Sequence, residues 1–171
     1  MHKLVDFEGY EQAVFSLQAS CAKFSRGYRL EYRLAGPLEQ IVLPKKNEVP
    51  TFRNELWKHT CFEAFFQDAS GHGYWEFNFS PSRDWAIYRF RSYRELDEVN
   101  LERMELLIQQ ERYPGELIMK IEVRPKDFFA VARVGLTAVL EHNDQRCSYW
   151  ALHHAREKPD FHAPESFMIN V

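Results

Sequence analysis

Residues 60–79 read TCFEAFFQDASGHGYWEFNF and contain two alternating segments joined by a loop with two glycines. In the first segment, Phe62, Ala64 and Phe66 share one face of an extended backbone, because successive side chains of a strand point to opposite sides. In the second segment, residues 74–79, aromatic side chains recur at every second position. Two such segments around a glycine-containing turn predict an antiparallel β-hairpin.

The same period of two recurs along much of the chain. Further strands are expected at Tyr28–Leu34, Leu38–Leu43, Asp84–Tyr93, Glu116–Arg124, Gly135–His142, Cys147–His153 and Phe167–Val171. Residues 101–110 fit both a helix and a strand, and the flanking turns favour a strand. One short helix is expected at Pro125–Val131, since proline fits the first helical turn. Strands that recur every 8–12 residues, roughly, between Gly, Pro and Asn turns predict an all-β fold. We expect a single-domain antiparallel β-sandwich over residues 1–171, with at most one or two short helices.

Composition bounds the classes of function. The 171 residues are 45% hydrophobic and 27% charged with a net charge of −3, which is typical of a globular domain and favours neither nucleic acid nor a membrane as partner. Cys21, Cys61 and Cys147 are an odd number without a close pair, so neither a disulfide framework nor a zinc knuckle is expected. Residues 1–13 are acidic and unlike a secretory signal, which predicts a cytoplasmic location.

Aromatic and acidic residues mark a candidate binding surface. Trp57 precedes the first strand of the hairpin, and an indole at a loop can stack on the apolar face of a sugar. Glu63 falls on the strand face opposite the apolar one, and Glu76 and Asn78 share that face if the two strands pair. Carboxylates there can accept hydrogen bonds from adjacent hydroxyl groups. In the alternative interpretation, Trp57 plugs the end of the sandwich and the acidic residues form a solvated face.

Histidines near the C-terminus raise the question of a metal. His153, His154 and His162 lie close to acidic residues in the sequence. Because His153 and His154 point to opposite faces of a strand, only His153 and His162 are metal candidates, and hydrogen-bonded loop histidines are the alternative. We predict no metal and no cofactor, with a divalent metal left open.

Three blocks of sequence resemble a known family. Trp57 followed by the strand at 62–68, FEAFFQD, resembles the type 9 carbohydrate-binding module of the DOMON-like group. Residues 74–81 resemble the next strand of that module, and segments 148–150 and 160–167 resemble its closing segment. The resemblance runs from Leu56 to the C-terminus, and its middle part matches only in strand pattern.

The resemblance implies a DOMON-like β-sandwich that holds a small sugar between two aromatic side chains. Trp57 falls on one clamp position, and Phe161 falls where the family has its second tryptophan, so the clamp is smaller here. Glu63 falls on an acidic sugar contact, and Asn78 and Glu76 fall on the polar strand. The ligand-binding candidates are Trp57, Glu63, Glu76, Asn78, Trp150 and Phe161.

The leading functional prediction is a non-catalytic module that binds a small carbohydrate-like ligand. An enzyme acting on a sugar-like metabolite through Glu63 and Glu76, or through a histidine metal site, is the alternative. A protein-interaction module is a further alternative. So is haem binding, because other members of the DOMON-like group bind haem through Met and His ligands. Met104 and Met119 lie in blocks too loosely aligned with that family to carry these ligand roles over, so haem ranks below a sugar.

Overall fold

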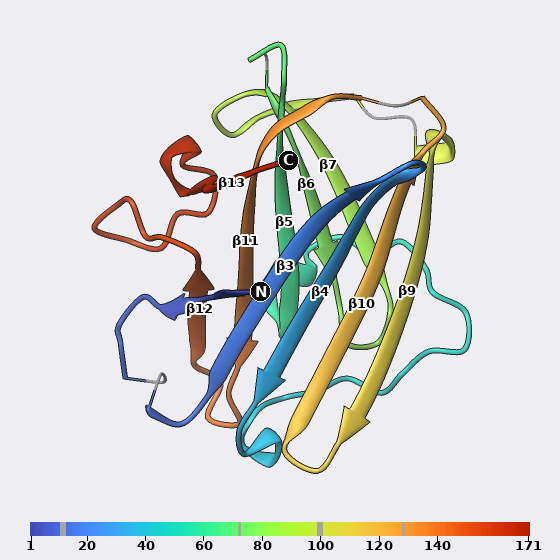
Figure 1. Ribbon diagram of the computed structural model, residues 1–171. Coiled ribbons are helices and arrows are strands. Elements are labelled where there is room, and N and C mark those ends of the chain that lie inside the picture. Colours follow the sequence, from blue (N-terminus) through green and yellow to red (C-terminus); the bar gives the residue numbers. More distant parts are fainter. Residues whose placement is uncertain (11–12, 72, 99–100, 128) are drawn as a thin grey trace.

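The computed structural model describes residues 1–10, 13–71, 73–98, 101–127 and 129–171. These residues form two antiparallel sheets that pack face to face, which confirms the predicted β-sandwich (Figure 1). Helical structure in the described part of the chain consists of three-residue 3₁₀ turns: η2 (Leu38–Gln40), η3 (Leu56–Lys58), η4 (Leu101–Arg103) and η5 (Pro164–Ser166). No helix in that part is long and apolar enough to cross a membrane.

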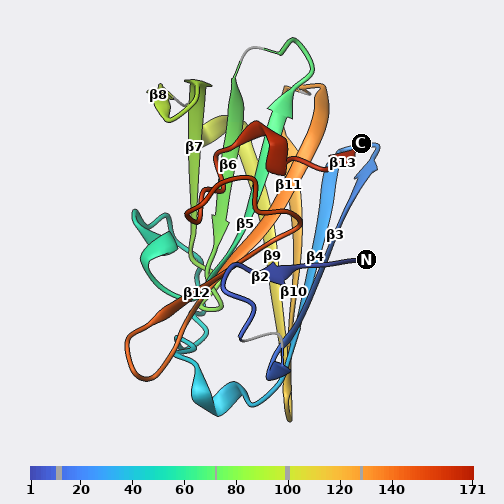
Figure 2. The same ribbon diagram turned by 90° about the vertical axis from the view of Figure 1, so that its left-hand side faces the viewer.

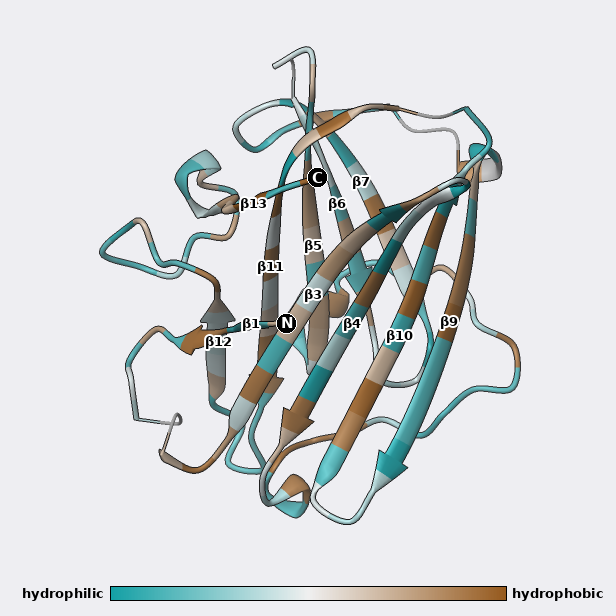
Figure 3. Cartoon of the chain, viewed as in Figure 1, coloured by the Kyte–Doolittle hydropathy of each residue, from teal (hydrophilic) through white to brown (hydrophobic). Residues whose placement is uncertain are grey.

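The first sheet has five strands among the described residues. In spatial order they are β1 (His2–Lys3), β3 (Ser16–Phe24), β4 (Gly27–Ala35), β10 (Glu116–Pro125) and β9 (Met104–Tyr113). One face of this sheet covers the core and the other faces solvent, so buried and exposed residues alternate along its strands. In β4, Tyr28 and Leu30 are buried whereas Arg29 is exposed, and Figure 3 shows the same alternation of brown and teal along β4 and β10.

The second sheet has eight strands among the same residues. Its spatial order is β2 (Val5–Asp6), β12 (Cys147–Ala151), β11 (Val131–Glu141), β5 (Cys61–Asp68), β6 (Tyr74–Phe79), β7 (Trp85–Ser92) and β8 (Glu95–Asp97), and β13 (Ile169–Asn170) also pairs with β11. The predicted hairpin is β5–β6, with Phe62 opposite Phe79 and Phe66 opposite Trp75. The side chains of Phe62, Ala64 and Phe66 enter the core between the sheets.

The central strand β5 is buried on both faces, unlike the strands of the first sheet. Residues 61–66 are all buried, including Glu63 and Phe65 on the face that points away from the core. That outer face is therefore covered by other parts of the chain. The cover comes mainly from residues 152–168, which leave the sheet after β12 and rejoin it at β13, and which we call the C-terminal excursion.

The pairing of β11 explains how the C-terminal excursion arises. β12 pairs with Thr137–Glu141 on one edge of β11, and β13 pairs with Arg133 and Val134 further along the same edge. The chain thus leaves the edge at Ala151 and returns to it at Ile169. Between those points it passes across the outer face of β5 and β6 (Figure 2).

Two local predictions are wrong. The expected strand at Leu38–Leu43 is the 3₁₀ turn η2 followed by one isolated bridge from Ile41 to His142, because Gly36 and Pro37 turn the chain away from β4. The expected helix at Pro125–Val131 is absent from the described residues of that segment. Pro125 instead ends β10 opposite Met104.

Other local predictions are confirmed or incomplete. Residues 104–113 are strand β9, as the turns favoured, and residues 101–103 form a 3₁₀ turn. The prediction placed no strand before Tyr28, yet β3 pairs with β4 along its whole length. In β3 the buried Leu17 and Ala19 are followed by less regular residues, so the alternation is short and weak.

Asp84 fastens the loop before β5 to the start of β7. Its side chain is 2% exposed, and its carboxylate accepts hydrogen bonds from Asn47 Nδ2 (2.7 Å), Thr51 N (3.0 Å) and Ser82 Oγ (3.1 Å). Arg53 Nε lies 3.1 Å from Asp84 Oδ2. Burial alone raises the pKa of Asp84, but the hydrogen bonds outweigh it and the net pKa lies below the usual range.

We expect Asp84→Asn to lower the free energy of unfolding by about 1–2 kcal/mol, because it weakens charge-assisted hydrogen bonds that hold a long loop. Urea denaturation at neutral pH measures the change. The matched control is Asp144→Asn, an aspartate 54% exposed that contacts Arg146 in a turn, and it should change stability by less than about 0.5 kcal/mol. Equal effects of the two substitutions would contradict the inference that Asp84 holds the loop before β5 to the start of β7.

Candidate functional site

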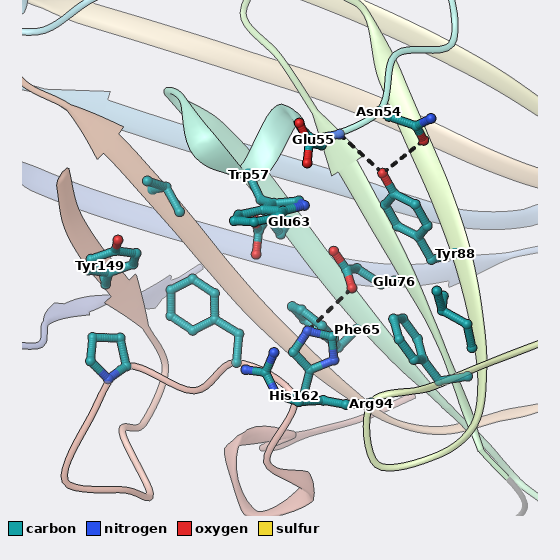
Figure 4. A pocket seen from close by; sticks show the side chains of 15 residues that line it. Asn54, Glu55, Trp57, Glu63, Phe65, Glu76, Tyr88, Arg94, Tyr149 and His162 are labelled. Atoms are coloured by element: carbon teal, nitrogen blue, oxygen red, sulfur yellow. Dashed lines mark hydrogen bonds and ion pairs between the residues drawn. The ribbon is translucent and has the colours of Figure 1, made fainter. Parts of the chain in front are cut away.

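A cavity of about 790 Å³ lies on the outer face of the second sheet (Figure 4). Its size is within the roughly 300–1,000 Å³ of pockets that hold small ligands. The lining residues are Asn54, Glu55, Trp57, Glu63, Phe65, Glu76, Tyr88, Phe90, Arg94, Leu96, Val139, Tyr149, Pro159, Phe161 and His162. They combine aromatic walls with a few acidic and basic groups.

The floor of the cavity follows from the period of two. Glu63 and Phe65 lie on the face of β5 opposite the core, and Glu76 on β6 stands directly across from Phe65. Tyr88 on β7 pairs with Glu76 in turn, so its ring lies on the same face. On the other side of β5, Tyr149 of β12 alternates with the buried Trp150 and points outward.

One wall of the cavity is the C-terminal excursion. It contributes Pro159, Phe161 and His162. The excursion is anchored by Phe167, whose ring stacks on Phe65 with centroids 5.8 Å apart. Gly135 of β11 makes this approach possible, because a Cβ there would lie 2.7 Å from Phe167 Cδ1.

A second anchor joins the C-terminal excursion to the end of β7. Asp160 accepts hydrogen bonds from the Tyr93 hydroxyl (2.7 Å) and from Arg94 Nη2 (3.0 Å). The backbone N–H of His162 also donates to Asp160 Oδ1 at 3.2 Å. These bonds hold His162 over the floor.

The rim opposite the C-terminal excursion is formed by η3. Leu56 is buried against Cys61 and Ala86, and this anchor leaves Trp57 45% exposed at the mouth of the cavity. The backbone N–H of Glu55 donates to the Tyr88 hydroxyl at 3.3 Å, which ties the start of the turn to β7. A large exposed indole held by a buried neighbour is suited to contact a ligand.

Glu63 is the most deeply buried acid in the cavity. Its side chain is 2% exposed, its Oε2 accepts a hydrogen bond from Thr137 Oγ1 (3.1 Å), and its Oε1 has no partner among the described residues. Burial raises the pKa of Glu63 well above its usual range, with repulsion from Glu76 adding to the shift. A buried oxygen without a partner is unfavourable, so a hydrogen-bond donor brought to this atom would be stabilising.

Glu76 belongs to a hydrogen-bonded chain. Its Oε1 accepts from Asn78 Nδ2 at 2.6 Å, and its Oε2 lies 3.6 Å from His162 Nε2. The Tyr74 hydroxyl accepts from the Arg94 backbone N–H (3.0 Å) and lies 2.8 Å from His162 Nδ1. When the Tyr74 hydroxyl donates its proton to Nδ1, the ring proton is on Nε2, facing Glu76.

The pKa values in this chain keep His162 neutral at pH 7 and leave Glu76 only partly ionised. Burial raises the pKa of Glu76 to about 7, although the Asn78 hydrogen bond and the charge of Arg94 oppose the shift. Burial also lowers the pKa of His162 to about 4, and the positive charge of Arg94 acts in the same direction. Glu76 and His162 therefore do not form a full ion pair at neutral pH.

Four of the six predicted ligand-binding residues line the cavity. They are Trp57, Glu63, Glu76 and Phe161. Asn78 is fully buried beneath the cavity, where it positions Glu76. The placement of Trp150 requires a correction: it is 0% exposed, belongs to the core between the sheets and donates from Nε1 to Ser148 Oγ at 2.9 Å. We remove it from the candidate site.

The candidate metal and haem ligands do not come together in the cavity. His162 lines the cavity whereas His153 is an exposed residue that does not. Within the described ranges, no group of three or more His, Cys, Asp or Glu side chains is arranged to hold a metal ion. Met119 is buried in the core and Met104 packs against it, so neither lines the cavity.

Sequence reasoning missed several lining residues. Tyr149 could have been found, because alternation with a core tryptophan sends it outward. Tyr88 and Arg94 belong to an arginine- and aromatic-rich segment whose arginines we interpret as paired surface charge rather than as an anion site. Phe65 alternates with apolar residues on both sides, and nothing in the local pattern separates its face from the core.

No protein-family model and no curated protein matches this chain. Solved structures do match it. A protein from Bacteroides uniformis ATCC 8492, to which carbohydrate binding is provisionally assigned, has a TM-score of 0.62 and 14% identity, over 97% of this chain and 83% of its own. A family 9 carbohydrate-binding module (CBM9) from Caldicellulosiruptor kristjanssonii, in complex with cellotriose and in complex with glucose, has a TM-score of 0.55 and 6% identity. That match covers 84% of this chain and 68% or 69% of the module.

This chain has a CBM9-like fold. The resemblance in its sequence predicts that Trp57 and Phe161 correspond to the two aromatic clamp positions of such modules. In this CBM9-like fold both residues line one cavity, although they come from η3 and the C-terminal excursion, about a hundred residues apart in the chain.

Proposed function

We propose that this protein binds a small carbohydrate in the cavity on its second sheet, without chemical change of the ligand. The observation that carries the proposal is Trp57, an exposed indole at the mouth of a 790 Å³ cavity that has Phe161 in its wall and carboxyl groups in its floor. Sugar rings present apolar C–H faces and polar edges, so they suit a cavity with aromatic walls and a polar floor.

The polar groups of the cavity can both accept hydrogen bonds from sugar hydroxyls and, when protonated, donate hydrogen bonds to them. Glu63 Oε1 lacks a partner, and Glu76 Oε2 has only the distant His162 Nε2. A hydroxyl both donates and accepts, so it can bond to these groups in either protonation state. The structural neighbours add support, since the CBM9 structures hold cellotriose or glucose on a similar fold.

We expect Trp57→Ala to weaken sugar binding at least about tenfold while leaving the fold intact, because the indole is exposed and its loss removes one stacking surface. Isothermal titration with mono- and disaccharides, first on the natural protein, measures the change. Tyr113→Ala is the matched control, because Tyr113 is 51% exposed and lies in the β9–β10 hairpin of the other sheet. Unchanged sugar affinity in Trp57→Ala, or no sugar binding by the natural protein, would contradict the proposed function.

The pair Glu63 and Glu76 favours one second candidate, an enzyme that uses acid–base chemistry on a sugar. Two buried acids with raised pKa values in one cavity are common at catalytic sites. Nuclear magnetic resonance of each bound sugar over many hours distinguishes the two functions. Product formation that is lost in Glu76→Gln would establish the enzyme, whereas unchanged spectra support binding alone.

A further inference from the structure

The deep end of the cavity is acidic, and no positively charged side chain among the described residues is bonded to its carboxyl groups. Glu63 and Glu76 both present carboxyl groups to the same space (Figure 4). The Oε1 atom of Glu63 is buried without a hydrogen-bond partner among the described residues, and its side chain is 2% exposed. This unpartnered atom is a second sign, besides the acidic cluster itself, that the cavity is built for a hydrogen-bond donor.

The basic groups of the lining do not neutralise these acids. Arg94 points its guanidinium to Asp160 at 3.0 Å and has a side chain 51% exposed. His162 is neutral at pH 7, and its Nδ1 is occupied by the Tyr74 hydroxyl. A ligand with an anionic group would meet two carboxyl groups first, so the charges favour a ligand that brings a positive charge.

We propose that the ligand is an amino sugar, bound with its protonated amine between the carboxyl groups of Glu63 and Glu76. This inference rests on the proposed carbohydrate-binding function and names the class of sugar. An ammonium group has three donors, which can serve the unpartnered Oε1 of Glu63 and the Oε2 of Glu76, whose neighbour His162 Nε2 is 3.6 Å away. Charge-assisted hydrogen bonds are roughly twice as strong as neutral ones.

The aromatic lining supports the same class of ligand. Phe65 lies in the floor beside both acids, two residues from Glu63 on β5 and directly opposite Glu76 on β6. A cation within about 6 Å of an aromatic face is attracted by the ring. A neutral sugar can satisfy Glu63 Oε1 with a hydroxyl, but it brings no positive charge that would favour the ionised form of either acid.

A metal ion fits the same groups poorly. Divalent cations bound by oxygen take about six or more ligands, usually including several carboxylates or carbonyls. The described residues hold no group of three or more His, Cys, Asp or Glu side chains in a suitable arrangement. An organic ammonium needs only the two acids that are present.

Titration calorimetry near neutral pH tests the proposal with matched pairs, glucosamine against glucose and galactosamine against galactose. We expect at least one amino sugar to bind about tenfold more tightly than its neutral partner, and its N-acetyl derivative to lose that gain because acetylation removes the charge. In two buffers of different ionisation enthalpy, amino-sugar binding should release protons, since the ammonium drives the two carboxyl groups to ionise.

Glu63→Gln isolates the source of the preference. It keeps the size and one acceptor oxygen but removes the charge, so it should weaken amino-sugar binding much more than neutral-sugar binding and thereby abolish the preference. Glu165→Gln, at a carboxylate 59% exposed that contacts Arg156, is the control and should retain the preference. Thermal unfolding of both variants checks that they fold.

The outcomes separate the two proposals. Equal or tighter binding of the neutral sugars overturns the amino-sugar inference and leaves carbohydrate binding in place. Binding of neither set overturns both. Binding of ethanolamine alone, without any sugar, also overturns both, because the recognised group would then be an amine outside the carbohydrate class.

Discussion

Trp150→Ala is expected to lower the free energy of unfolding by about 3–5 kcal/mol, the usual cost of removing a large aromatic side chain from a packed core. Trp150 is fully buried between the sheets, and its indole N–H donates to Ser148 Oγ, which in turn lies 3.0 Å from His142 Nε2. The substitution leaves a large cavity and removes one hydrogen-bond donor from the buried Ser148 Oγ. Urea denaturation followed by circular dichroism measures the loss.

Two further variants make this test decisive. Trp150→Phe keeps most of the apolar volume, so it should fold and bind sugar like the natural protein even if the alanine variant does not fold. Trp57→Ala should change stability by less than about 0.5 kcal/mol, because Trp57 is 45% exposed. Near-normal stability of Trp150→Ala together with lost sugar binding would return Trp150 to the binding site and refute its assignment to the core.

The second large effect is on the pH dependence of stability. Glu76 has a folded-state pKa of about 7, above the ordinary value of 4.5. Below pH 4.5 the group is protonated in both states; between 4.5 and 7 only the unfolded state ionises. Stability from this group is therefore fully present in acid and is lost as the pH rises to about 7, by an amount on the order of 2–3 kcal/mol.

Glu76→Gln should remove this loss, since glutamine stays neutral and its amide oxygen can still accept the Asn78 hydrogen bond. We expect the variant to be more stable than the natural protein at pH 8 and to differ little from it at pH 4, as measured by urea denaturation at both values. The exposed Glu165 serves again as control through Glu165→Gln. Parallel pH profiles of the natural protein and Glu76→Gln would show that the cavity does not raise the pKa of Glu76.

The hairpin at the centre of the second sheet was predictable because its signal is local. Alternation over residues 62–66 assigns neighbouring side chains to opposite faces wherever the segment is extended. The glycine-containing loop before Tyr74 then determines that the two strands pair in an antiparallel way. From this it followed that Glu63 and Glu76 share a face, and the structure places them there.

The failures arise because a strand needs a partner strand, which the local sequence does not show. Leu38, Ile41 and Leu43 are apolar enough to suggest a strand, but no neighbouring strand extends along them, and hydrogen-bonded pairing rather than hydrophobicity decides whether a strand forms. β3 was overlooked because its alternation ends after Ala19. Its partner β4 stabilises it through a ladder that no local pattern reports.

Trp150 shows the limit of a face assignment. Period two predicts that Tyr149 and Trp150 point in opposite directions, but it does not say which direction is the core. Both faces of the second sheet are covered, one by the first sheet and the other in part by the C-terminal excursion. Only the packing of these layers decides that Trp150 is inside and Tyr149 is in the cavity.

The sequence by itself determined that the chain is all-β, that β5 and β6 pair, and that two acids lie on the face away from the core, because these features depend on neighbours within about 20 residues. The cavity was decided by the tertiary structure. Residues 152–168 have no periodic pattern, and their path depends on where β13 rejoins β11 and on Asp160 meeting Arg94, 66 residues away. Contacts of that separation arise only once the sheet exists, so the wall that brings Phe161 and His162 to Glu76 could not be read from local pattern.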